Sequence, residues 1–215
     1  AACRCRMAEP PAGAALAPES PRSRSPPVAV RPPLWEHRAS LSTPTRPLDV
    51  TAFKDKQGAC LARWRKLRDA GCLADLHDAH FDWWMFPIDD GSRPAWNVRC
   101  EADIRRLRAD SSWLLGYRLA VRMCARAWGW DARAARPARA GLRWTGPDVR
   151  LAKIVRSLWL FGEAPLLASM QALARVVQRD CKGGAAFRYG RVVLDELLHM
   201  RLPPGKGERA GEGRK

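Results

Sequence analysis

The 215-residue chain lacks the cysteine spacing on which metal sites and disulfide frameworks depend. Its seven cysteines are odd in number and scattered, with no Cys-x-x-Cys pair, and only Cys3 and Cys5 are close together. Structural zinc sites and secreted disulfide-rich domains both need paired, local cysteines. We therefore expect thiols in a reducing, intracellular compartment, and neither a metal nor another cofactor.

Long apolar runs are also missing. No window approaches the 18 apolar residues that a membrane-spanning helix requires, which excludes a transmembrane segment. Convincing period-two alternation, the mark of half-buried strands, is missing as well. Hydrophobic residues nevertheless make up 47% of the chain and include ten tryptophans, enough for a sizeable core.

Acidic residues are scarce, with 22 Asp and Glu against 38 Lys and Arg, a formal net charge of +16. The charge is uneven: residues 69–90 hold six aspartates and no Lys or Arg, whereas residues 118–156 hold ten basic residues and two acids. A positive field attracts nucleic acid, acidic proteins or anionic lipids. Solvated helix faces rich in arginine explain the same composition without any partner.

Composition divides the chain into three parts. Residues 1–47 are rich in Pro, Ala, Arg and Ser and cannot bury enough apolar surface to fold, so we expect a disordered tail. Residues 203–215 form a second, flexible basic tail. Residues 48–202 are expected to form one all-α domain, a compact bundle of six or seven helices. An organelle-targeting role for the first tail stays open.

Helical periodicity and end signals place the helices. Asp110 to Ser112 provide an N-terminal cap, Gly71 and Gly162 are typical of helix C-termini, and Pro87 stops a helix. The spacing predicts a loop over 87–99 and a loose segment over 131–144. The expected helices cover residues 53–70, 73–86, 101–109, 112–129, 145–162, 164–179 and 190–201.

Residues 76–87, Leu-His-Asp-Ala-His-Phe-Asp-Trp-Trp-Met-Phe-Pro, concentrate the chemistry of the chain. In one interpretation they form the wall of a peptide-binding site, with an acidic pocket suited to a free amine; the candidate ligand-binding residues are then His77, His80, Asp82 and Trp83. In the other, aromatic residues such as Trp84 and Phe86 are core, since large apolar side chains at a helix end usually dock on their neighbours.

The same segment permits a metal hypothesis. His77 and His80 are three residues apart on the expected helix and could face one ion, with Asp78, Asp82, Asp89 or Asp90 completing the shell. A helical His-Asp pair, here His77 and Asp78, is also the core of the all-α HD phosphohydrolases. That family's pattern also needs an earlier His and a later Asp, for which His37 and Asp131 are the rough candidates, so the match is partial. The alternative packs His80 beside Trp84 and leaves His77 in solvent.

A row of arginines forms the third candidate site. Arg118, Arg122 and Arg126 repeat every four residues and therefore share one helix face. If this helix and the one after residue 147 are antiparallel, Arg150 and Lys153 would extend the row into one phosphate-binding face. No nucleic-acid motif accompanies it, and a solvated face accounts for the same spacing.

Two segments resemble the conserved domain of the opioid growth factor receptor family. Residues 84–87, Trp-Met-Phe-Pro, are similar to its Trp-Leu-Phe-Pro, and residues 150–158 are similar to its Arg-Ile-x-Arg-Ile-Leu-x-Ser-Leu, followed by a glycine. The signature residues are Trp84, Phe86, Pro87, Ile154, Ser157, Leu158 and Gly162. The resemblance implies a non-enzymatic, peptide-binding helical domain with a nuclear or perinuclear location, in which Trp84 packs on the 150–158 helix.

Three functions are therefore carried forward. The first is a receptor-like module that binds a peptide or protein, the second a nucleic-acid binder that uses the arginine face, and the third an HD-like phosphohydrolase. The oligomeric state is left open by the sequence.

Overall fold

The computed structural model describes residues 48–202 except 90–91, 139–143, 145–147 and 190–191; the two expected tails, 1–47 and 203–215, lie outside the described residues. The predicted all-α fold is confirmed, with only two short hairpins in addition. No helix in the described part is both long enough and apolar enough to cross a membrane. The helices are α1 (Val50–Asp69), α2 (Asp82–Met85), α3 (Glu101–Ala109), α4 (Ser111–Ala127), α5 (Asp148–Phe161) and α6 (Ala164–Val176).

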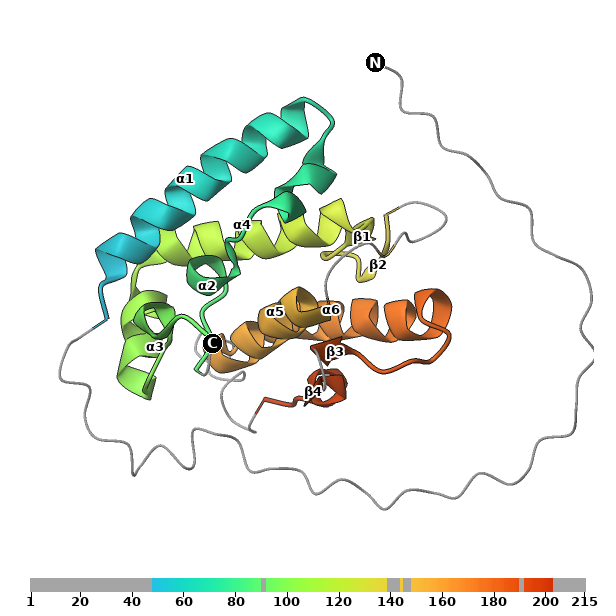
Figure 1. The fold of residues 1–215 in the computed structure, drawn as a ribbon. Helices are drawn as coiled ribbons and strands as arrows, with labels where there is room; N and C mark the ends of the chain where they lie inside the picture. Colours follow the sequence, from blue (N-terminus) through green and yellow to red (C-terminus); the bar gives the residue numbers. More distant parts are fainter. Residues whose placement is uncertain (1–47, 90–91, 139–143, 145–147, 190–191, 203–215) are drawn as a thin grey trace, which may run out of the picture.

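The helices form two neighbouring pairs around one core. Helix α1 lies along α4, and α5 lies along α6, while α3 contacts both α4 and α5 (Figure 1). The antiparallel hairpin of β1 (Trp130–Asp131) and β2 (Arg136–Pro137) follows α4, and a second hairpin pairs β3 (Arg188–Tyr189) with β4 (Val192–Val193). One apolar cluster joins all six helices, and its largest fully buried side chains include Trp64, Trp113, Trp128 and Trp130.

Polar caps and glycines end the helices where the sequence indicates. Asp110 caps α4 by accepting a hydrogen bond from the backbone N–H of Trp113 at 2.9 Å, and Asp49 caps α1 in the same way. Gly71 and Gly162 follow α1 and α5 with φ of +74° and +68°, a left-handed conformation that glycine adopts without strain. The predicted bounds of α1, α3 and α4 are therefore accurate to within a few residues.

The helix expected over residues 73–86 is wrong. The chain forms a 3₁₀-helix, η2 (Leu73–Asp78), an extended residue at Ala79, and then the single turn of α2. A continuous helix would use the carbonyls of His77 and Ala79 internally. In the structure both carbonyls instead accept hydrogen bonds from Arg150 of α5. Hydrogen bonds from the Arg150 side chain thus replace the backbone hydrogen bonds that a continuous helix would form at these two carbonyls.

The last expected helix, over residues 190–201, is also wrong. Only the 3₁₀-turn η5 (Asp195–Leu198) is helical there, after β4. Asp195 accepts a hydrogen bond from the backbone N–H of Phe187 at 2.8 Å, which connects this turn to the residue that precedes β3. The α-helical part of α6 ends at Val176 and is followed by the π-turn η4 (Val177–Cys181). A 3₁₀-turn, η3 (Pro94–Trp96), lies within the segment expected to be a loop.

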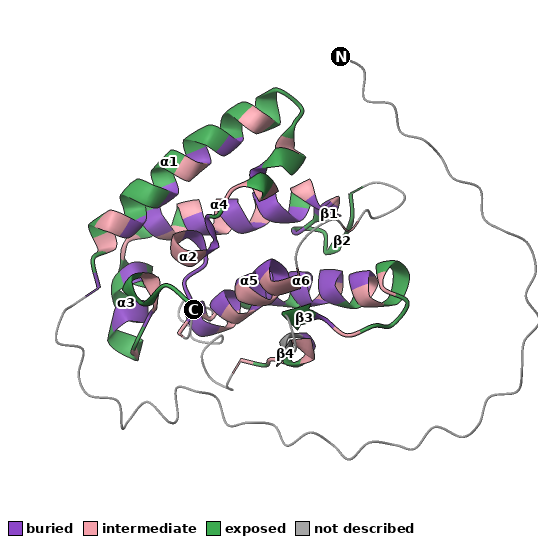
Figure 2. Cartoon of the chain, in the orientation of Figure 1, coloured by how far each residue is buried: buried purple, intermediate pink, exposed green. Residues whose placement is uncertain are grey.

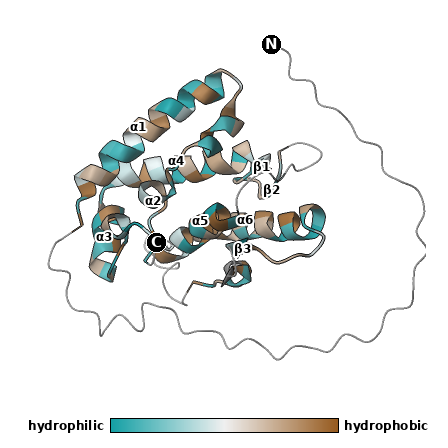
Figure 3. Ribbon diagram, viewed as in Figure 1, coloured by the Kyte–Doolittle hydropathy of each residue, from teal (hydrophilic) through white to brown (hydrophobic). Residues whose placement is uncertain are grey.

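Burial is distributed unevenly among the helices. Helix α1 is exposed along its outer side, whereas α4, α5 and α6 are buried over much of their length (Figure 2). Hydropathy follows the same division, with hydrophilic residues frequent along α1 and apolar residues frequent in α6 (Figure 3). The outer side of α1 is therefore a hydrophilic surface of the fold.

Candidate functional site

Three cations of α5 face the acidic segment that precedes α3. Arg150, Lys153 and Arg156 are spaced three residues apart and so share one side of the helix. Lys153 Nζ lies 2.5 Å from Asp82 Oδ2, and Arg156 Nε lies 2.6 Å from Asp89 Oδ1. Part of the basic segment therefore pairs with the acidic segment inside the fold.

Arg150 is the most deeply placed of these cations, with 5% of its surface exposed. Its guanidinium donates hydrogen bonds to the backbone carbonyls of His77 at 2.9 Å and Ala79 at 3.2 Å. It also lies over the ring of Phe81, 4.5 Å from the centroid, and 3.8 Å from a carboxylate oxygen of Asp82. Arg150 thus holds residues 77–82 against α5.

His77 is a half-buried, neutral histidine. Its Nδ1 lies 3.1 Å from Nη1 of Arg150, which can only donate, so Nδ1 accepts and the ring proton resides on Nε2. The ring stacks on Trp128 with 4.7 Å between centroids and 2° between planes. Burial, helped by the positive charge of Arg150, lowers the pKa of His77 from 6.5 to about 3.

Among the described residues, this geometry does not bring the side chains of the metal hypothesis together. The Nδ1 lone pair of His77 is directed at a guanidinium, and His80 stacks on Trp83 rather than beside His77. Asp131, the later acid, uses its carboxylate to accept the backbone N–H groups of Arg133 and Ala134. Within the described ranges no three His, Cys, Asp or Glu side chains are grouped so that they could hold an ion. His37 lies outside these ranges.

The neutral state of His77 predicts a loss of stability in mild acid. Its folded-state pKa of about 3 lies below the unfolded value of 6.5, so only the unfolded chain binds this proton between these values. The free energy of unfolding should therefore fall as pH drops from 6.5 towards 3, by at most about 1.4 kcal/mol per pH unit.

Urea unfolding at several pH values, followed by tryptophan fluorescence, measures this dependence. His77→Asn should flatten the curve below pH 6.5, whereas His80→Asn, at an exposed position, should leave it unchanged. Equal slopes in the wild type and in His77→Asn would contradict the neutral state of His77.

The residues proposed as a peptide-binding wall are already engaged. Asp82 is 8% exposed and is paired with Lys153. Trp83 is half-buried; its Nε1 donates to Ser92 Oγ at 3.2 Å, and Lys153 and Arg93 lie 5.5 Å and 5.1 Å from its ring centroid. Cations thus occupy the surroundings of both Asp82 and Trp83.

The signature residues of the family resemblance belong mostly to the core. Phe86 contacts the ring of Tyr117, whose hydroxyl donates to Ser157 Oγ at 3.0 Å, and Ile154, Leu158 and Pro87 are buried. The segments 82–85 and 148–161 do contact one another. The aromatic contacts of Trp84, however, are with Trp83 and Trp96, and its Nε1 donates to Cys60 Sγ of α1 at 3.4 Å. The expected packing of Trp84 on α5 is thus replaced by a contact with α1.

The arginines of α4 are in a different position from those of α5. Arg118 forms a two-pronged ion pair with the buried carboxylate of Glu163, with distances of 2.7 and 2.8 Å. Arg122 has no hydrogen bond or ion pair with any described residue, and its Nε is buried. Burial, together with the like charges of Arg133 and Arg118, lowers the pKa of Arg122. The merged face with Arg150 and Lys153 is not formed, because those two point into the fold.

The β1–β2 hairpin adds two arginines that the sequence did not assign to this face. Arg133 affects the titration of Arg122, and Arg136 and Arg126 both help lower the pKa of Asp131, after the hydrogen bonds from Ala134 and Arg133. These interactions group the arginines around the C-terminal half of α4. We call this set the arginine face: Arg118, Arg122, Arg126, Arg133 and Arg136. Arg133 and Arg136 lie outside the helix, so helical spacing does not relate them to Arg118, Arg122 and Arg126. Only the hairpin brings them close.

The comparisons with known proteins identify no relative. No family model, no curated protein and no solved structure matches the chain. The function must therefore be argued from the arrangement of its own residues.

Proposed function

We propose that the chain is a non-enzymatic binding module that recognises the phosphate groups of nucleic acid through its arginine face. The observation that carries the proposal is the state of Arg122, a guanidinium with a buried Nε and no partner among the described residues, beside two further arginines. A phosphate offers the acceptor oxygens that such a donor group lacks.

The local charge supports an anionic ligand. Five arginines in the face are accompanied by two acids. Glu163 is paired with Arg118, and Oδ1 of Asp131 accepts the backbone N–H groups of Arg133 and Ala134. Arg126, Arg133 and Arg136 are exposed, and no ion pair with a described residue engages them. A cluster in which five arginines outnumber two acids keeps an excess of positive charge, which raises the local concentration of polyanions and speeds their association.

The other candidate surface fits a ligand less well. The carboxylates that would attract a basic peptide are already satisfied by Lys153 and Arg156. Releasing them would break buried ion pairs, which costs more than an exposed peptide amine returns. Nucleic acid therefore takes precedence over a basic peptide as the proposed ligand.

Fluorescence anisotropy with labelled single-stranded and duplex oligonucleotides tests this function on the full chain. If about four phosphates are contacted, affinity should fall roughly a hundredfold between 50 and 200 mM salt. Arg126→Gln combined with Arg133→Gln should weaken binding at least tenfold and reduce the salt dependence, because two phosphate contacts are lost.

The charge-matched control is Arg105→Gln with Arg106→Gln on α3, where both residues are exposed. An equal loss in this control would show that only net charge matters and would contradict a site at the arginine face. Absence of salt-dependent binding would remove the function altogether.

Kinship with the opioid growth factor receptor family stays a proposal. It is supported by the contact between the two segments that carry the resemblance and by Gly162 at the end of α5. The nuclear location that the resemblance implies is compatible with a nucleic-acid ligand.

A further inference from the structure

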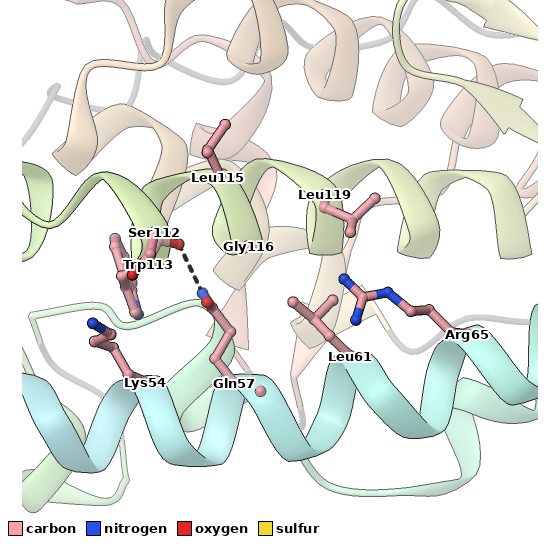
Figure 4. A pocket seen from close by; sticks show the side chains of 10 residues that line it. Lys54, Gln57, Leu61, Arg65, Ser112, Trp113, Leu115, Gly116 and Leu119 are labelled. Carbon is pink, nitrogen blue, oxygen red and sulfur yellow. Dashed lines mark hydrogen bonds between the residues drawn. The ribbon is translucent and has the colours of Figure 1, made fainter.

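A groove separates the exposed sides of α1 and α4 (Figure 4). Its volume is about 410 Å³, within the range of roughly 300–1,000 Å³ typical of ligand pockets. Leu61, Leu115 and Leu119 supply apolar surface, and Lys54 and Arg65 lie towards its opposite ends. The groove is distinct from the arginine face, because none of its lining residues belongs to that set.

Two glycines make the groove possible. At Gly116, an added Cβ would lie 2.1 Å from Oε1 of Gln57, whose amide donates to the carbonyl of Trp113 at 3.0 Å. Gly116 therefore lets the two helices approach closely. At Gly58, in contrast, an added Cβ would meet no atom within 4 Å. The side of α1 at Gly58 thus opens onto unfilled space.

Leu115 lies at the edge of the groove, with its side chain on the side of α4 turned away from α1 (Figure 4). It is 65% exposed, one of only three large hydrophobic side chains so exposed in the described part of the chain. It follows Trp113, which is fully buried, by two helical positions. An open groove between two helices, with apolar side chains such as Leu61 and Leu119 along it, can accommodate the apolar side chains of an amphipathic helix.

The charge around the groove specifies the helix. Helix α1 carries six Lys and Arg residues and two aspartates. Lys54 is paired with Asp110 at 3.0 Å, but Arg65 forms no hydrogen bond or ion pair with a described residue. A docked segment with carboxylates on its flanks would match this surface, and one with cations would be repelled.

We propose that the α1–α4 groove binds an acidic amphipathic helix of a partner protein. Apolar side chains of that helix would occupy the space beside Gly58 and contact Leu61 and Leu119. Its carboxylates would pair with Arg65 and the neighbouring cations of α1. The chain would then hold nucleic acid at one surface and an acidic protein segment at another.

The test uses a fluorescein-labelled synthetic helix with leucines on one face and glutamates on the other, and a matched peptide with lysines in place of the glutamates. Anisotropy should show that the full chain binds the glutamate peptide at least tenfold more tightly than the lysine peptide. Gly58→Phe should fill the groove and weaken binding at least tenfold. Gly58→Ala is the matched control and should change affinity less than twofold.

A charge reversal provides a second, independent variant. Arg65→Glu should weaken the glutamate peptide and strengthen the lysine peptide, an exchange that a folding defect cannot produce. Arg126→Gln with Arg133→Gln should leave peptide affinity unchanged, which separates this inference from the proposed function.

Unchanged binding in Gly58→Phe, or equal binding of the two peptides, would overturn the proposal. Sedimentation of the full chain as a dimer that Gly58→Phe converts to a monomer would also overturn it, and would assign the groove to a second copy of the chain.

Discussion

Arg150→Met is expected to lower the free energy of unfolding by about 3–5 kcal/mol, the usual cost of removing one partner from a buried polar cluster. Methionine occupies much of the volume of the aliphatic part of arginine but donates no hydrogen bond. The carbonyls of His77 and Ala79 would lose the donor that now satisfies them. Each buried acceptor left without a partner costs about 1–3 kcal/mol.

Urea unfolding at pH 7.5, followed by tryptophan fluorescence, gives this value. Arg126→Gln is the control: it removes an equal charge from an exposed position of α4 and should change stability by no more than about 0.5 kcal/mol. A loss below about 1 kcal/mol in Arg150→Met would mean that residues 77–82 find other donors, and would contradict the structural role assigned to Arg150.

Phe86→Ala is expected to cost about 3–5 kcal/mol, whereas Trp83→Ala should cost no more than about 1 kcal/mol. Phe86 is fully buried and contacts the rings of Phe81 and Tyr117, so its removal leaves a cavity in the core. Trp83 is half-buried, and its ring contacts are with Arg93, Lys153, His80 and the partly buried Trp84, at the edge of the core. The two aromatic residues are three positions apart, yet their side chains should contribute very different amounts to the free energy of unfolding.

The same unfolding experiment compares these two variants. A difference of at least 2 kcal/mol is expected, and circular dichroism should show that both remain helical. Similar losses for the two substitutions would show that Trp83 belongs to the core, and would remove the distinction between the buried and the accessible side of residues 81–87.

Local signals in the sequence were sufficient for most of the helices. The N-terminal cap at Asp110, the glycines at 71 and 162 and the apolar period of α4 each act within a few residues, so they can be read without the fold. Residues 73–86 were misassigned because their conformation depends on Arg150, more than 70 positions later. The apolar period there is real, but a remote donor competes for the carbonyls.

The candidate sites show the same limit. The spacing of Arg118, Arg122 and Arg126 correctly indicates one helix face, yet nothing in the spacing of Arg150 and Lys153 reveals that they are buried against carboxylates. Charge patterns show which residues share a face and not what that face meets. The groove at Gly58 was missed for a similar reason, because an isolated glycine within a helix gives no sign of open space beside it.

The cations along α5 also determine where that helix can sit. Sliding α5 by one turn, about 5.4 Å, would bring each cation to its neighbour's position and leave a buried charge at one end with no counterpart. Apolar side chains alone would tolerate such a displacement far better, since one leucine can replace another. Each of Arg150, Lys153 and Arg156 meets its own acceptor in only one position of the helix. These three contacts therefore select a single axial register for α5.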